Sequence, residues 1–542
     1  MLAYGIMPPL MFLGMICFML IGFPVAFSLG AVGLFFGGIG ILTGHFEWQL
    51  LQALPLRVHG IVSNELLLAI PFFTFMGAIL ERCGLAEDLL EGTGQLFGPL
   101  PGGLAVAVII VGAILGAITG TVAASVIAMG VISLPIMLRY GYDMKLATGV
   151  IAASGTITQL IPPSLVLVVL ADQLGKSVGD MYKGAIGPSI AQVTIFVVYI
   201  FALSLFKPKM MPPLPPEART LRGWALWQRV LWGMVPSIVL IFLVLGTIFM
   251  GLATPTEAGA MGAVGAIVLA ALHRRLTWPL VRQGMETTMR ITAMVIFILL
   301  GSTVFSLVFQ GVDGGVWIEH LLSGLPGGQV GFLIVVNVFV FFLAFFLDFF
   351  EIAFIIVPML APVAAKMGID LIWFGVLLCV NMQTSFMHPP FGFALFYLRG
   401  IAPKEVKSSD IYWGAIPWVF LQLILVAMLI FWPGMVTYWL DKEVAVDLDK
   451  VKIELPGDNA PGSGDAAKDA GDAQKAQDEA TSDIQKSYGG ADETKPDETK
   501  PDETRADETK PDAPRPTPAG KGSADEKFNS EIERALKAGG GK

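Results

Sequence analysis

Two short stretches of this sequence place a proline pair beside hydroxyl and amide side chains in otherwise apolar surroundings. They read TQLIPPSLV, from Thr158 to Val166, and TSFMHPPFG, from Thr384 to Gly392. Proline lacks a backbone N–H and clashes with the carbonyl one turn earlier, so each pair should unwind a helix. The carbonyls freed by unwinding and the nearby hydroxyls are oxygen donors suited to Na⁺, and helix N-termini attract carboxylates. These stretches therefore predict the binding of a cation and of a carboxylate.

The elements that hold these stretches must be membrane helices. The 542 residues are 54% hydrophobic and only 15% charged, and the mean hydropathy is +0.70. Apolar segments near the roughly 20 residues that cross a bilayer recur between Met7 and Leu440, and no basic segment precedes the first, as a cleavable signal would require. Unwound backbone at membrane depth is tolerated only where it is buried in protein or lines a cavity. We expect an all-α polytopic membrane protein.

The second proline pair follows the first by 227 residues (389 minus 162), and the same shift aligns other positions. The aligned residues are all helix-breaking or polar: Pro135 with Pro362, Gly141 with Gly368, and Asp143 with Asp370. Such self-similarity predicts two related halves, residues 1–206 and 230–440, which are joined by a connector at 207–229.

Basic residues indicate how the two halves are oriented. The connector carries five Lys and Arg residues, and segment 274–290 carries four, which places both in the cytoplasm by the positive-inside rule. Residues 1–10 carry none, so the first half should begin outside. The halves are then inverted relative to each other, which requires an odd number of crossings in each.

Five crossings and one re-entrant hairpin fit each half. The expected crossings of the first half are 8–21, 24–41, 65–81, a broken helix at 145–171, and 190–206. A hairpin is expected at 101–138, where GAITGT, from Gly116 to Thr121, divides an apolar stretch into two short arms. In the second half the hairpin is expected at 326–363, divided by LDFFE from Leu347 to Glu351, and the broken helix at 371–398.

Discontinuous helices in inverted repeats mark the binding sites of secondary transporters, so we expect one cation site in each half. The first is predicted from a hairpin tip and a broken helix: Gly116, Thr119, Gly120, Thr121, Ser125, Ser154, Gly155, Thr156, Thr158 and Pro162. The second is predicted from Asp348, Glu351, Asn381, Gln383, Thr384, Ser385 and His388. The residues expected to contact substrate are Gln159, Ser164, Gln383 and Thr384.

Several of these residues have a purely structural alternative. Asp348 could cap a helix, although an ionisable group among phenylalanines at bilayer depth is costly and by default functional. His388 could cap a broken helix end or titrate during transport. The hydroxyls of the first hairpin could bond to their own helix or to a neighbouring one. The cysteines are isolated in sequence and are expected to be packing residues: Cys17, Cys83 and Cys379.

Four segments, taken in order, carry a resemblance to a known family. They are GAITGTVAASVIAMGVISLPIM, ASGTITQLIPPSLVLVVLAD, LDFFEIAFIIVPMLAPVAAKMGID and NMQTSFMHPPFGFALFYLRGIAP. Residues 1–440 resemble the large membrane subunit, or DctM-type subunit, of tripartite ATP-independent periplasmic (TRAP) transporters. This resemblance implies an elevator-type symporter of the bacterial inner membrane, usually driven by Na⁺. It would receive an organic acid from a periplasmic substrate-binding protein and work with a small four-helix membrane subunit, expected as a separate chain.

The resemblance also implies where the ions bind. The family's sodium sites lie at the hairpin tips and helix breaks, which correspond here to Gly116–Thr121 with Gly155–Pro162, and to Asp348 with Gln383–Pro389. Asp348 stands between Leu347 and Phe349 where the family commonly has Met-Asp followed by small or hydroxyl residues, and His388 stands where threonine is frequent. Two alternatives therefore stay open for the second site: an altered cation site, or a proton in place of a sodium ion.

Other classes of protein fit this sequence less well. A membrane redox enzyme would need paired histidines or clustered cysteines as ligands, whereas the five histidines and three cysteines here are scattered. The sequence also has no P-loop for binding a nucleotide. No cofactor and no nucleic-acid partner are expected, and the nearest rival is a stand-alone anion/sodium symporter that uses no binding protein. Residues 441–542 include KPDETKPDETRADETKPD, from Lys495 to Asp512, and are expected to form a disordered acidic tail.

Overall fold

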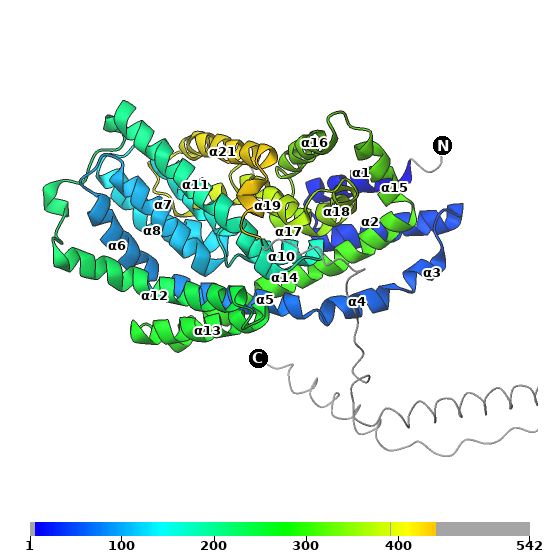
Figure 1. Cartoon of the computed structure of the whole chain (residues 1–542), viewed down its shortest axis with the longest axis horizontal. Coiled ribbons are helices and arrows are strands. Elements are labelled where there is room, and N and C mark those ends of the chain that lie inside the picture. The colour runs from blue at the N-terminus through cyan, green and yellow to red at the C-terminus, as the bar shows by residue number, and fades with distance from the viewer. Residues whose placement is uncertain (1–5, 391, 441–542) are drawn as a thin grey trace, which may run out of the picture. The chain divides into compact units, whose positions relative to one another are not determined.

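The computed structural model describes residues 6–390 and 392–440, and every regular element in these ranges is a helix (Figure 1). The expected disordered tail at 441–542 and the side chains of Thr119 and Ser323 lie outside the described part of the chain. Eight described helices are long and apolar enough to cross a membrane, or nine if the bent pair Trp48–Val62 and Glu65–Arg82 counts as one span. The predicted all-α, multi-pass architecture is therefore confirmed.

The first half contains a hairpin followed by a broken helix. Its helices are α1 (Met7–Ile21), α2 (Val25–Thr43), α3 (Trp48–Leu51), α4 (Leu54–Val62), η1 (Glu65–Leu68), α5 (Ala69–Arg82), α6 (Leu85–Phe97), α7 (Gly103–Thr119), α8 (Val122–Arg139), α9 (Met144–Thr156), η2 (Ile157–Gln159), α10 (Leu165–Leu174) and α11 (Val178–Phe206). Helix α11 begins well before the expected residue 190, because Ser177 caps its start and Pro188 does not end it.

The connector holds two single turns, η3 (Pro208–Met210) and η4 (Pro216–Ala218). The second half then contains α12 (Trp224–Phe249), α13 (Pro255–Leu272), α14 (Trp278–Gly311), α15 (Gly314–Ser323), α16 (Gly328–Leu343), α17 (Phe349–Glu351), the π-turn η5 (Ile352–Ile356), α18 (Val357–Lys366), α19 (Leu371–Met382), η6 (Gln383–Phe386), α20 (Phe393–Ile401), α21 (Ser408–Phe431) and α22 (Gly434–Thr437).

The positions matched by the 227-residue shift have equivalent local structures. Gly141 and Gly368 both have positive φ angles, of 81° and 71°. Asp143 and Asp370 each follow such a glycine and cap the next helix, α9 or α19, by accepting backbone N–H groups. Each of these helices then ends in a short 3-10 turn before a cis Pro-Pro peptide bond. This agreement supports the interpretation of two repeats.

The helices that precede the two proline pairs form the centre of the core. Every residue from Leu146 to Thr156 in α9 is buried, and so is every residue from Ile372 to Met382 in α19. Helix α9 packs against α21 of the second half, and α19 packs against α10 and α11 of the first half. Figure 1 shows α10, α17 and α19 near the middle of the helical body. The two halves therefore interlock through their broken helices.

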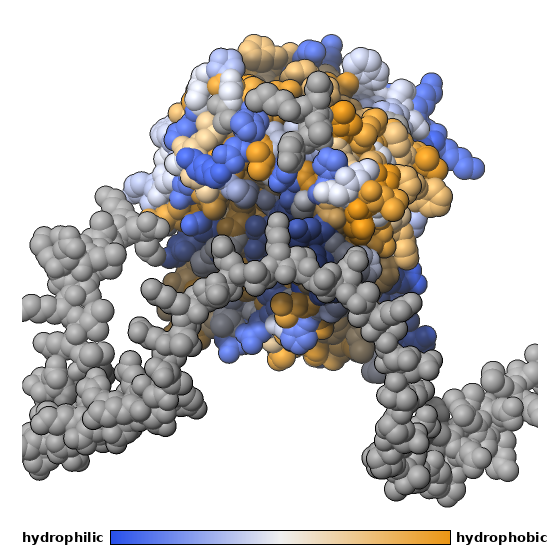
Figure 2. Space-filling model, turned by 90° about the vertical axis from the view of Figure 1, so that its right-hand side faces the viewer, coloured by the Kyte–Doolittle hydropathy of each residue, from blue (hydrophilic) through white to orange (hydrophobic). Residues whose placement is uncertain are grey.

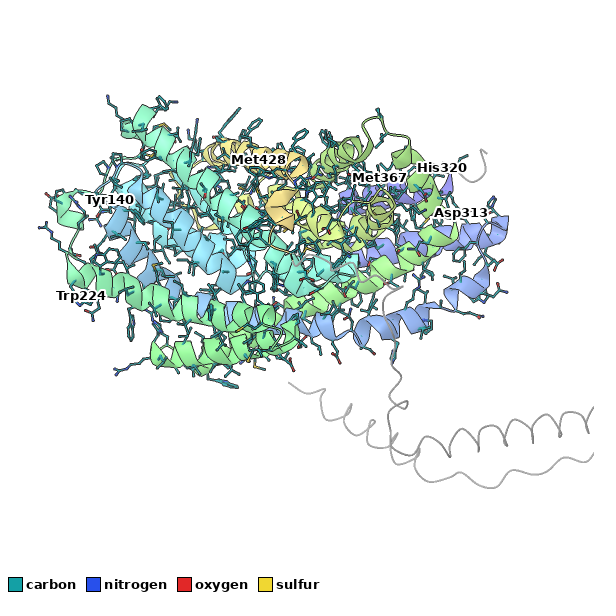
Figure 3. The ribbon with its side chains drawn as sticks, viewed as in Figure 1. Tyr140, Trp224, Asp313, His320, Met367 and Met428 are labelled. Atoms are coloured by element: carbon teal, nitrogen blue, oxygen red, sulfur yellow. The ribbon has the colours of Figure 1, made fainter. Side chains whose placement is uncertain are left out.

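The outer face of the described helices is that of a membrane protein. Large apolar side chains such as Phe27, Phe35 and Phe242 are exposed, and Figure 2 shows broad hydrophobic areas on one face. In Figure 3, Tyr140 at the end of the first hairpin lies at the same end of the body as Trp224, beside the basic connector. Met367, at the end of the second hairpin, lies at the opposite end with Asp313 and His320. The last residues of the two hairpins thus lie toward different ends of the body, and the inverted arrangement of the halves stays a prediction.

A prediction concerns the close approach of α9 and α21. A Cβ atom on Gly149 would collide with the carbonyl oxygen of Gly414 and lie 2.7 Å from Trp418 Nε1. Gly149→Val should therefore lower stability by more than the roughly 1–3 kcal/mol typical of overpacking, since backbone must move. Gly38→Val on α2 is the matched control, because a Cβ atom there has no neighbour within 4 Å. Thermal unfolding in detergent measures both variants, and equal midpoints would contradict this packing.

Candidate functional site

The first hairpin packs directly against the first helix break through glycines. A Cβ atom on Gly112 would lie 2.7 Å from the Cβ of Ser154, and one on Gly116 would lie 2.8 Å from the Cα of Thr158. A Cβ atom on Gly155 would collide with Val126 of α8. Gly120 ends α7 with a φ of 62°, and extended Thr121 precedes α8. The structure thus brings the predicted tip and break together because the approaching residues lack side chains.

The hydroxyls of the first break are buried and donate within their own helix. Ser154, Thr156 and Thr158 are all 0% exposed, and their hydroxyls donate to the carbonyls three residues earlier at 3.0, 2.9 and 3.0 Å. The hydroxyls of the break therefore bond to backbone within their own segment. A hydroxyl that donates in this way still has lone pairs with which to accept, so these oxygens remain possible cation ligands.

Residues around the first proline pair collect the backbone groups that the break frees. Ser164 caps α10 by accepting from the N–H of Val166, and it donates to the carbonyl of Gln159 at 2.5 Å. The hydroxyl of Ser189 on α11 donates to the carbonyl of Leu160 at 3.2 Å. Pro162 and Ser125 are buried beside this segment. The Oε1 atom of Gln159 is buried and has no hydrogen-bond partner among the described residues, so the predicted substrate contact keeps a free acceptor.

At the second hairpin, Asp348 and Glu351 bond to each other's backbone. The N–H of Glu351 donates to Asp348 Oδ1 at 3.0 Å, and the N–H of Asp348 donates to Glu351 Oε2 at 2.9 Å. Asp348 is thus the N-cap of α17 in a capping box. Glu351 is only 8% exposed, and no ion pair to either carboxylate occurs within the described ranges. Two carboxylates without a countercharge are therefore buried or half-buried here.

The second helix break meets its hairpin through amide and aromatic groups. Asn381 Nδ2 donates to the backbone carbonyl of Asn337 on α16 at 2.7 Å. The ring of His388 lies 4.4 Å from that of Phe341 and 4.2 Å from that of Phe345, between ring centroids. Thr384 and Ser385 donate to carbonyls three residues earlier, both at 2.7 Å. Asp348 has no hydrogen bond to residues 381–388 in the part of the chain that the structure describes, so the predicted second set divides into two groups.

Two glutamines that the sequence analysis missed contact the second break, and one of them also contacts the first. Gln192 of α11 and Gln422 of α21 both donate an amide N–H to Gln383 Oε1, at 2.6 and 3.3 Å. Gln422 Nε2 also lies 3.4 Å from Thr156 Oγ1. A lone carboxamide in an apolar membrane helix was the available signal, since such groups usually bond across helices. Asn337 was also missed, because a single carboxamide in an apolar helix does not reveal which neighbour it contacts.

The oxygen donors of the two predicted sites are of the kind that hard cations prefer. These donors belong to hydroxyls, carboxamides, backbone carbonyls and two carboxylates. No group of three or more His, Cys, Asp or Glu residues that could hold a metal occurs among the described residues. Cys83 and Cys379 are buried and Cys17 is exposed, and all three are free thiols.

Comparison with known proteins places the chain in a family. Residues 12–435 match the family described as "Tripartite ATP-independent periplasmic transporter, DctM component". The C4-dicarboxylate TRAP transporter large permease protein DctM of Pseudomonas aeruginosa is 30% identical over 400 residues, which cover 73% of this chain and 91% of that protein. The protein of the same name from Vibrio cholerae is 28% identical, with 77% and 94% covered.

A longer relative and a solved structure extend the comparison. The isethionate TRAP transporter permease protein DctMQ of Oleidesulfovibrio alaskensis is 27% identical, with 74% of this chain and 61% of that protein covered. The fold is shared with the YdaH transporter of Alcanivorax borkumensis, at a TM-score of 0.51 and 16% identity, covering 71% of this chain and 88% of that one. The chain therefore belongs to the DctM family of tripartite ATP-independent periplasmic transporters, in which it is a large permease subunit and not an enzyme.

Proposed function

We propose that this permease imports an organic acid together with Na⁺ across the bacterial inner membrane by an elevator mechanism. The observation that carries the proposal is the pair of buried helix breaks, each lined by hydroxyl and amide oxygens and each packed against a hairpin. In other transporters with broken helices, unwound backbone carbonyls coordinate Na⁺, and half-helix N-termini point at anionic groups of the substrate. We infer the same roles here for the freed oxygens of the breaks and for the N-terminus of α10.

Two polar cavities beside the hairpins support alternating access. A cavity of about 490 Å³ lies between α6 and α8 and is lined by Glu91, Arg139 and Tyr140. Another of about 380 Å³ lies beside η5 and α18, where Asn64 Nδ2 donates to Asp172 Oδ1 at 2.7 Å. Each cavity separates a hairpin from helices outside it. In the proposed mechanism, the hairpins and broken helices move together past α2, α5, α12, α13 and α14.

The substrate class and the partners are proposed from the relatives. Their names specify C4-dicarboxylates, isethionate, 2,3-diketo-L-gulonate and sialic acid, all of which are organic anions. The family description is tripartite, and the name DctMQ points to a second membrane component. We propose that a small four-helix subunit and a periplasmic binding protein complete this transporter.

Sodium coupling predicts that Na⁺ stabilises the purified protein. Replacing choline chloride by NaCl at equal ionic strength should raise the thermal unfolding midpoint, because an ion at 100 times its Kd adds about 2.7 kcal/mol of stability. Thr158→Val removes one oxygen at constant shape and should raise the half-saturating Na⁺ concentration at least tenfold. Thr247→Val is the matched control, since among the described residues that hydroxyl bonds to carbonyls within α12. A wild-type midpoint that is the same in both salts would refute the proposal.

A second variant separates the capping role of Asp348 from a cation-binding role. Asparagine caps helices about as well as aspartate, so Asp348→Asn should leave the midpoint in choline nearly unchanged. Removal of the carboxylate charge should nevertheless raise the half-saturating Na⁺ concentration. Titrations of both proteins by thermal unfolding provide the comparison. If the Na⁺ titration of Asp348→Asn superposes on that of the wild type, Asp348 is a cap alone.

Dependence on a binding protein distinguishes this function from a stand-alone symporter. Proteoliposomes that contain the permease and its small subunit should take up radiolabelled succinate, isethionate or sialic acid only after the corresponding binding protein is added. The control omits the small subunit and retains the binding protein. Uptake at an equal rate without any binding protein would identify a stand-alone symporter instead.

A further inference from the structure

Three glutamine side chains meet between the two halves of the protein. Gln192 and Gln422 lie on α11 and α21, outside the hairpins and the helix breaks, whereas Gln383 begins η6 directly after α19. Their exposed fractions are 1%, 0% and 0%. Thr156, at the end of α9, is the position that the 227-residue shift matches to Gln383. The cluster therefore joins corresponding points of the two breaks.

The hydrogen bonds of the cluster converge on one atom. Gln383 Oε1 accepts from Gln192 Nε2 at 2.6 Å and from Gln422 Nε2 at 3.3 Å. Because Oε1 and Nε2 belong to one planar carboxamide, holding Oε1 also fixes the direction in which Gln383 Nε2 donates. Gln422 lies within reach of Thr156 Oγ1 as well, at 3.4 Å. A displacement of either break therefore changes the bonds at the other.

The cluster is poorly suited to a role in stability alone. Gln192 Oε1, Gln383 Nε2 and Gln422 Oε1 have no hydrogen-bond partner among the described residues. An unpaired buried polar group costs about 1–3 kcal/mol, whereas an apolar group of similar shape costs nothing of this kind. Buried polar groups that lack part of their hydrogen bonds need a specific explanation. These groups lie between the two breaks, which suggests that they couple the breaks.

We propose that Gln192 and Gln422 are positioning residues that hold Gln383 and Thr156 in register, so that the two breaks bind Na⁺ cooperatively. This inference depends on the proposed sodium coupling. Neither glutamine is required to touch an ion, because each acts through Gln383 or Thr156. Loss of Gln422 removes the side chain that contacts both breaks. Loss of Gln192 frees the carboxamide of Gln383, through which Gln422 acts. Either change leaves the oxygens of each break in place.

The test is a Na⁺ titration of thermal stability on the full-length permease, with Gln192→Met, Gln422→Met and the double variant. Methionine keeps the length of an unbranched side chain and removes the hydrogen bonds. The wild type should show a Hill coefficient above one. Each single variant should show a coefficient near one and at least a fivefold higher half-saturating concentration. The double variant should resemble the singles, because both glutamines act through the same acceptor.

Controls keep this inference separable from sodium coupling itself. Ser237→Ala removes a fully buried hydroxyl that bonds within α12, and it should change the midpoint in choline without changing the half-saturating Na⁺ concentration. If one glutamine variant fails to fold, the other still tests the shared acceptor. A wild type that Na⁺ does not stabilise contradicts the proposed function. A Na⁺-stabilised wild type with a coefficient of one, or variants with wild-type titrations, overturns the positioning role alone.

Discussion

Backbone groups that lose their helical partners inside a membrane must find others within the protein, and this requirement organises the core of the molecule. At the first break, Ser164 and Ser189 satisfy the carbonyls of Gln159 and Leu160. These partners come from the segment itself and from α11, so the break can form only where α11 lies against it. The broken helices therefore occupy the most buried part of the protein, and the hairpins close over them.

The two breaks have equivalent backbone structures, but different side chains surround them. The first is closed by glycine contacts to its hairpin and is lined by uncharged oxygens, so its dipoles alone would balance a bound cation. At the second, larger residues fill the interface, with Asn337 against Asn381 and the ring of His388 between two phenylalanines. The second predicted set also includes the carboxylates of Asp348 and Glu351, which form a capping box. Ions at the two proposed sites would therefore differ in how strongly burial and charge contribute to binding.

The sequence was informative where a residue type leaves few structural choices. The proline pairs disrupt a helix, and glycine at 141 and 368 permits a positive φ. Aspartate at 143 and 370 favours the start of a helix. These residue types indicate from sequence where the breaks and the hairpin ends lie. Helix capping by Asp348, which the structure shows in a capping box with Glu351, was only one of two interpretations from sequence, the other being a functional role. Gln192, Gln422 and Asn337 were missed because a single amide in an apolar helix does not reveal which neighbour it meets. That depends on packing between residues 191 positions apart, as for Gln192 and Gln383.

The proposed function requires each of the two helix breaks to bind one sodium ion. Equilibrium binding of ²²Na⁺ to the purified permease can be measured by scintillation proximity at increasing Na⁺ concentrations. We expect saturation at two ions per chain. Saturation at one ion, or no saturable binding, would show that the two breaks do not each hold an ion.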